Sequence, residues 1–224
     1  QLNKLITTKM TIKKMKTLNL FYVSVLAMGV ALASCSQGGQ KQAADNAAVE
    51  EKTVEIADVT ISPDQSKVVW AGESFGVYTH TGIIKLTETE LVMKDGKIAG
   101  GSFTVDMNTI STTDDNYDAE KGNTPEKLVG HLMSPDFFDV ASHPVAKFEI
   151  TSVDGNTASG LLTLRGITNE EKVENIAIMK EGEKVKITGD MTFDRKKYDV
   201  AWDYPMKEMV LSDDVKLQIE LIGS

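Results

Sequence analysis

Cysteine is almost absent, because the 224 residues contain only Cys35. A single cysteine cannot form an intramolecular disulfide, and it excludes zinc sites built on paired cysteines. Histidine is nearly as rare: His80, His131 and His143 lie in three separate segments and show no His-x-x-x-His spacing. We therefore predict no metal site, and we expect each histidine to be hydrogen-bonded or exposed.

Signatures of nucleotide binding are also missing. The chain has no P-loop and no dinucleotide-binding fingerprint. Its acidic stretch "TTDDNYDAEKGN" (112–123) contains Asp114, Asp115, Asp118 and Glu120. That stretch lacks the regular ligand spacing of a calcium loop with glycine at the sixth place. A solvated acidic loop is favoured over a calcium site.

Positive charge is scarce and unevenly distributed. The chain has 24 lysines and arginines against 33 acidic residues, and residues 1–35 hold five of the basic residues and none of the acids. The remaining 19 basic residues face 33 acids, which corresponds to a formal charge of −14. Such a balance argues against binding to nucleic acid and against broad adhesion to anionic lipid head groups.

The N-terminal region has the layout of an export signal. Residues 1–17 are basic and polar, and the apolar run "LNLFYVSVLAMGVALAS" (18–34) ends in small residues. This order is typical of a secretory signal peptide, and the run is shorter than the roughly 20 residues of a membrane-spanning helix. Because the first residue is Gln1, we expect translation to start at Met10 or Met15.

The tetrapeptide "LASC" (32–35) resembles the lipobox of bacterial lipoproteins. The resemblance implies cleavage before Cys35 and attachment of diacylglycerol to its sulfur; the alternative is a free cysteine in an ordinary signal. Two acyl chains on one residue supply the pair of signals that stable anchoring requires. We expect a signal peptide over 1–34, a lipidated cysteine and flexible tether over 35–58, and one domain over 59–224.

This organisation predicts a location as well. The lipid anchor would hold the protein on a membrane of the cell envelope, facing the periplasm. Ser36 follows the cysteine, in place of the aspartate that commonly retains lipoproteins at the inner membrane. The outer membrane is therefore preferred.

Alternation with a period of two dominates the domain. In "KVKITGDMTFD" (184–194) and "SDDVKLQIEL" (212–221) apolar and polar residues alternate, which is typical of strands with one dry face and one wet face. The turn sequences "KDGK", "VDGN" and "KEGEK" separate such runs and predict antiparallel hairpins. We expect eight or nine strands, near 66–72, 75–86, 90–94, 97–107, 145–153, 157–164, 171–179, 184–194 and 214–222.

The expected fold is all-β, a single antiparallel eight-stranded barrel with a short helical insertion, because closure removes exposed strand edges. An outer-membrane barrel shows the same alternation with its apolar side outward. The lipobox, the helix and the terminal Gly223-Ser224 disfavour that alternative.

The insertion "NTPEKLVGHLMSPDFFD" (123–139) contains two candidate helix starts. Thr124 can cap with Pro125 at the first helical position, and Ser134 repeats the pattern with the following proline. Phe137 and Phe138 are adjacent, so on a helical turn they diverge by about 100°. We predict that one plugs the barrel while the other packs under the helix; the alternative role for one of them is to line a ligand tunnel.

Four sequence blocks of the domain follow one another in a characteristic order. They are "KLVGHLMSPDFFDVASHPVAKFEI" (127–150), "GLLTLRGIT" (160–168), "MTFDRKKYDV" (191–200) and "SDDVKLQIEL" (212–221). In order and spacing, these blocks resemble the YceI-like family of periplasmic polyisoprenoid-binding barrels, although Asn169 and Glu170 replace the proline and valine usual in that family. The resemblance implies a lipocalin-like barrel capped by a helix, with a long apolar pocket for an isoprenoid chain such as a polyprenyl phosphate or a quinone tail.

Candidate pocket residues come from the apolar strand faces and from the two phenylalanines above. Arg165 ends an apolar strand and is a candidate partner for an anionic head group, with an exposed strand-end arginine as the alternative. Arg195, Lys196 and Lys197 are expected to form a solvated turn. The predicted wall residues of the pocket are Trp70, Phe103, Phe148, Leu162, Leu164, Phe193 and Trp202. The alternative is that these side chains form an ordinary barrel core.

We therefore expect a binding protein that takes up an isoprenoid in a dry tube, where each Å² of buried apolar area contributes about 25 cal/mol. No cofactor is expected apart from such a lipid as ligand. One alternative is a structural or interaction lipoprotein with a filled barrel. The other is a small-molecule enzyme, which would need inward polar groups. The oligomeric state stays open, with a homodimer among the options.

Overall fold

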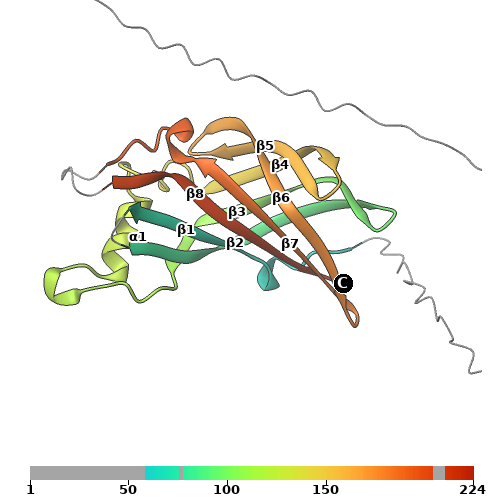
Figure 1. Ribbon diagram of the computed structural model, residues 1–224, viewed down its shortest axis with the longest axis horizontal. Coiled ribbons are helices and arrows are strands. Elements are labelled where there is room, and N and C mark those ends of the chain that lie inside the picture. Colours follow the sequence, from blue (N-terminus) through green and yellow to red (C-terminus); the bar gives the residue numbers. More distant parts are fainter. Residues whose placement is uncertain (1–58, 76–77, 204–209) are drawn as a thin grey trace, which may run out of the picture. The chain divides into compact units, whose positions relative to one another are not determined.

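The computed structural model describes residues 59–75, 78–203 and 210–224. They form a closed barrel of eight antiparallel strands in which each strand pairs with its neighbours in the chain and the last strand pairs with the first (Figure 1). The predicted fold class is confirmed. The strands are β1 (Lys67–Phe75), β2 (Tyr78–Lys94), β3 (Lys97–Thr112), β4 (Val145–Asp154), β5 (Thr157–Leu164), β6 (Ile167–Glu181), β7 (Lys184–Asp194) and β8 (Val210–Gly223).

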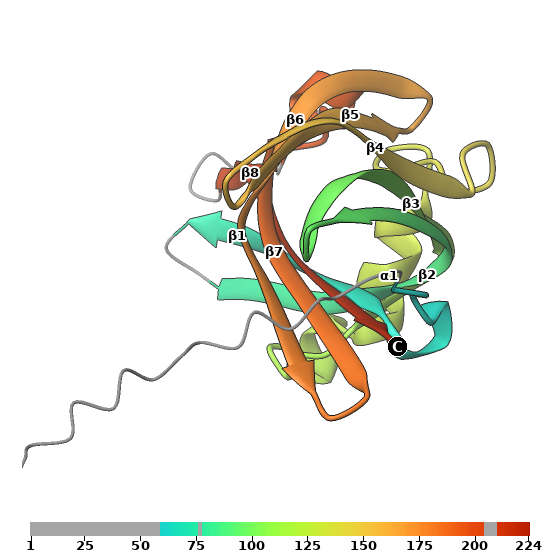
Figure 2. The same ribbon diagram turned by 90° about the vertical axis from the view of Figure 1, so that its right-hand side faces the viewer.

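Alternating sequence accounts for the wall of the barrel. In β7 the side chains of Val185, Ile187, Met191 and Phe193 are buried, whereas Asp190 between them is exposed. Successive side chains of a strand point to opposite faces, so one face forms the interior and the other meets water. Figure 2 shows the strands as a ring around that interior.

The structure merges two of the predicted strands into one. The two separate strands predicted near 75–86 and 90–94 are one, β2. Its pairing with β3 shifts register between Ile83 and Lys85 and again between Leu86 and Glu88. Such bulges change the phase of the alternation without ending the strand, so the polar stretch between the two runs does not mark a break.

One predicted helix forms and the other does not. Helix α1 (Pro125–Met133) begins after Thr124, whose Oγ1 accepts the N–H of Lys127 at 3.3 Å. The second start predicted at Ser134 is wrong, because Ser134 ends α1: its backbone N–H and its Oγ both donate to the carbonyl oxygen of His131. The hydroxyl that would cap a new helix is used at the end of the old one, and residues 135–138 form turns.

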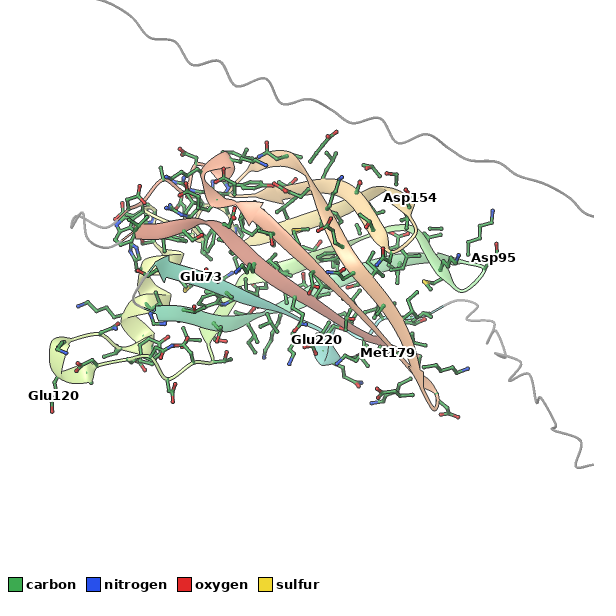
Figure 3. The ribbon with its side chains drawn as sticks, viewed as in Figure 1. Glu73, Asp95, Glu120, Asp154, Met179 and Glu220 are labelled. Carbon is green, nitrogen blue, oxygen red and sulfur yellow. The ribbon has the colours of Figure 1, made fainter. Side chains whose placement is uncertain are left out.

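The barrel has two distinct ends (Figure 1). The helix end carries α1 and the starts of β4, β6 and β8. The hairpin end carries the β2–β3, β4–β5 and β6–β7 turns, and Figure 3 shows Asp95 and Asp154 at this end and Glu120 at the other. The described chain enters at the hairpin end, where the Thr60 N–H donates to the Ser224 carbonyl oxygen at 3.0 Å.

The predicted signal peptide, Cys35 and the tether lie outside the described residues. Within 59–75, 78–203 and 210–224, none of the helices has both the length and the apolar character needed to cross a membrane.

Candidate functional site

A cavity of about 380 Å³ lies inside the barrel towards its helix end. This volume falls within the range of roughly 300–1,000 Å³ that ligand pockets occupy. The hairpin end is filled instead: Ile98, Val185 and Leu221 are buried there and do not border the cavity. The interior is therefore hollow at the helix end and packed at the hairpin end.

Consecutive inward positions of the strands build the cavity wall. Along β1 these positions are Val68, Trp70, Gly72 and Ser74, and all four border the cavity. The remaining strands contribute mainly apolar side chains, and α1 covers one side with Leu128, His131 and Leu132. Apolar residues from the strands include Val105, Ala146, Phe148, Leu162, Leu164, Met191, Phe193, Leu217 and Ile219.

Nine of the ten predicted pocket residues border this cavity, and their role in binding stays a prediction. Arg165 does not border it. Its Nη1 donates to the Asp199 carbonyl oxygen and lies 3.0 Å from Asp199 Oδ2, while its Nη2 donates to the Pro135 carbonyl oxygen at 2.9 Å. Arg165 therefore joins two turns. The nine residues are Trp70, Phe103, Phe137, Phe138, Phe148, Leu162, Leu164, Phe193 and Trp202.

Phe137 and Phe138 both border the cavity, so the prediction that they separate is wrong. Their ring centroids lie 4.9 Å apart in a T-shaped arrangement. The divergence of about 100° applies to consecutive residues of a helix, but these two residues lie in a turn. Phe103 and Phe148 form another ring pair of the lining, 5.5 Å apart.

Arg195 was expected in a solvated turn, but its side chain is fully buried. Each of its five N–H groups has an acceptor, which exhausts the capacity of a guanidinium. This network ties the segment after β7 to the start of β8. Its acceptors are the carbonyl oxygens of Ser212 (3.0 Å), Val200 (2.7 Å) and Trp202 (2.7 Å) and the carboxylates of Asp203 (2.9 Å) and Asp213 (3.2 Å).

The structure also corrects the expectation that Asp114 lies in a solvated acidic loop. Its Oδ1 lies 3.0 Å from His80 Nδ1, its Oδ2 accepts the Thr81 N–H at 2.8 Å, and the Tyr117 ring stacks on His80. Burial raises the pKa of Asp114, but the hydrogen bonds from Thr81 and His80 outweigh it and the net shift is downward. Among the described residues, no group of three acidic, histidine or cysteine side chains is placed to hold a metal ion.

Two polar side chains of the lining were missed by sequence reasoning. Ser74 is 5% exposed, and its Oγ has no hydrogen-bond partner among the described residues; the same holds for the buried Nε2 of His131. The His131 ring contacts Trp202 at 4.6 Å and Phe137 at 5.6 Å. Ser74 shares the inward register of Trp70, and that register was the signal available in the sequence.

Comparisons with known proteins agree with this architecture. The family model of the YceI-like domain matches residues 59–222. A UPF0312 protein of Staphylococcus aureus (strain bovine RF122 / ET3-1) is 36% identical over 98 residues, which are 39% of this chain and 56% of that protein. A UPF0312 protein of S. aureus strain N315 is 31% identical over 123 residues, 50% of this chain and 71% of that protein. The chain thus spans little more than half the length of the first relative.

Two solved structures share the fold. BcnA of Burkholderia cenocepacia superposes with a TM-score of 0.59 at 19% identity, over 74% of this chain and all of that one. A polyisoprenoid binding domain from Saccharophagus degradans superposes with a TM-score of 0.52 at 12% identity, over 74% of this chain and 97% of that one. Because the family model covers most of the chain and the barrel agrees with it, this protein belongs to the YceI-like family.

Proposed function

We propose that this chain binds a long apolar isoprenoid inside its barrel and acts as a binding protein rather than an enzyme. The observation that carries the proposal is the apolar cavity at the helix end, which distinguishes this barrel from one filled by its own side chains. The fold that it shares with a polyisoprenoid binding domain supports the same ligand class.

The physical basis of binding is desolvation. Each CH₂ group that leaves water for an apolar wall contributes about 0.8 kcal/mol. Trp70, Phe103 and Phe148 present large apolar surfaces to the cavity, and β5 adds Leu162 and Leu164. A flexible hydrocarbon chain gains from every unit that it places against such a surface, so affinity should rise with chain length.

Extraction of lipid from natively purified protein tests the proposal. Organic extracts analysed by mass spectrometry should contain a polyprenyl species or a quinone at about one molecule per chain, as expected for a small barrel with one ligand cavity. Empty extracts from a protein that also fails to take up added isoprenoid would support a structural role instead.

We further propose that Cys35 carries a diacylglycerol anchor that holds the domain at a membrane of the cell envelope, facing the periplasm, with the outer membrane preferred. The motif "LASC" at the end of the apolar run supports this location, and two acyl chains give stable attachment.

Changing the proposed attachment residue should detach the protein. We expect Cys35→Ala to move it from the membrane fraction to the soluble fraction on cell fractionation, because the sulfur that would carry the lipid is gone. Ser36→Ala, a change of similar size at the next residue, should leave the protein in the membrane fraction. Retention of Cys35→Ala on membranes would contradict the anchor.

A further inference from the structure

Two buried polar atoms in the cavity have no partner in the described part of the chain, Ser74 Oγ and His131 Nε2. Leaving a buried donor or acceptor unpaired costs free energy, because the group has lost its hydrogen bonds to water. Both atoms belong to residues that line the cavity. A ligand in the cavity is therefore in a position to satisfy them.

A chain of contacts places the two residues at the same end of the cavity. The His131 ring packs against Trp202, whose carbonyl oxygen accepts a hydrogen bond from Arg195. The Nε of Arg195 donates in turn to the carbonyl oxygen of Ser212 in β8. The neighbouring residue of β8, Leu211, pairs with Ser74 in β1. All of these residues lie at the helix end.

We propose that Ser74 and His131 bind the head group of the isoprenoid, and that this head group is an uncharged hydroxyl or carbonyl rather than a phosphate. The inference rests on the proposed function, because it assumes that an isoprenoid occupies the cavity. A serine hydroxyl donates and accepts, and a neutral imidazole nitrogen does one or the other according to its tautomer. An alcohol or a quinone oxygen matches such a pair.

The charges around the cavity favour an uncharged head group. All five N–H groups of Arg195 are already bonded within the protein. Lys147 is paired with Glu149 at 2.9 Å, and the exposed Lys127 donates to the Gly122 carbonyl oxygen at 3.0 Å. Asp203 and Asp213 add negative charge beside Arg195. A phosphate at this end would lose hydration without gaining an unused guanidinium from the described part of the chain.

The ionisation of His131 agrees with the same conclusion. Burial lowers the pKa of His131, and this effect outweighs the opposing charge of Asp136. At neutral pH the ring is therefore uncharged and attracts an anion less than an imidazolium would.

Binding of ligands with the same chain and different heads tests the inference. We expect geranylgeraniol to bind at least about tenfold more tightly than geranylgeranyl phosphate, measured by quenching of tryptophan fluorescence and by calorimetry. Phosphate binding equal to or tighter than alcohol binding would overturn the inference and leave the proposed function standing. Failure of both ligands and of the hydrocarbon analogue without a head group would refute the proposed function itself.

Matched variants locate the head group. Ser74→Ala and His131→Phe should each weaken geranylgeraniol binding about two- to tenfold, the effect of one hydrogen bond. Binding of the hydrocarbon analogue should not change, which separates loss of the polar contact from damage to the pocket. Thr89→Val is the control, since Thr89 Oγ1 is also buried and has no hydrogen-bond partner among the described residues, but Thr89 does not line the cavity. Equal losses for alcohol and hydrocarbon would overturn the assignment.

Discussion

Gly72→Phe should leave the barrel folded and lower its affinity for an isoprenoid by about tenfold or more. Gly72 borders the cavity, and a Cβ added there meets no atom of the other described residues within 4 Å, its two chain neighbours aside. A phenylalanine at this position therefore enters open space that the ligand would otherwise use. Displacing two CH₂ groups of the ligand already lowers affinity by about tenfold, because each contributes about 0.8 kcal/mol. A fluorescent isoprenoid analogue titrated into the variant measures the loss.

Thermal unfolding distinguishes a blocked pocket from a damaged fold. Filling a cavity commonly stabilises a protein by about 0.5–2 kcal/mol, so the Tm of ligand-free Gly72→Phe should stay constant or rise. Gly100→Phe is the matched control. It also places a ring in a strand where an added Cβ meets no atom of the described residues beyond its chain neighbours within 4 Å, but Gly100 does not line the cavity. Normal affinity in Gly72→Phe would mean that the lipid binds elsewhere.

The second large effect is on the stability of the barrel. Arg195→Met should lower the free energy of unfolding by about 3–5 kcal/mol, because it leaves three backbone carbonyl oxygens without their shared donor, and each buried polar group left unpaired costs about 1–3 kcal/mol. The carboxylates of Asp203 and Asp213 keep Lys196 as a partner. For a domain of this size the Tm should fall by about 6–20 °C, at about 2–4 °C per kcal/mol. Scanning calorimetry or circular dichroism measures the shift.

Arg165→Met provides the comparison for this effect. Arg165 forms an ion pair with Asp199, whose side chain is 74% exposed, and such pairs contribute about 1 kcal/mol or less. We therefore expect a much smaller decrease in Tm than for Arg195→Met. Similar losses from the two variants would show that burial of Arg195 adds little to the stability of the barrel.

Strand alternation made most of the fold predictable, because burial of one face in two is a local property of the sequence. The inward positions of β5, β7 and β8 follow directly from the apolar residues at every second place. The pocket residues Leu162, Leu164 and Phe193 were found in the same way. The helix start at Thr124 was predictable for a similar reason, since its capping partner is only three residues away.

Features that depend on distant partners were not predictable. Three consecutive basic residues, beginning with Arg195, predicted a solvated turn. The structure buries Arg195 instead, because its hydrogen-bond acceptors come from residues 200–203 and 212–213. Asp114 was predicted to lie in a solvated loop, but it is hydrogen-bonded to His80 in β2, which is 34 residues away in the sequence. The volume left inside the barrel also depends on how all eight strands pack, so an open cavity and a filled core look alike in sequence.

The order of the strands has a consequence for folding. Seven of the eight strand interfaces join elements that follow one another in the chain, and only β1–β8 joins its ends, pairing Lys67 with Glu220. The entropy of closing a long loop is therefore concentrated in one strand pairing, while the other pairings are comparatively local. The segment before β1 adds to that pairing, because Ile61 bridges to Gly223 and the Ser66 hydroxyl accepts the Ile222 N–H at 2.9 Å. The β1–β8 pairing together with these contacts closes the curved sheet into a barrel, and only a closed barrel encloses an apolar interior.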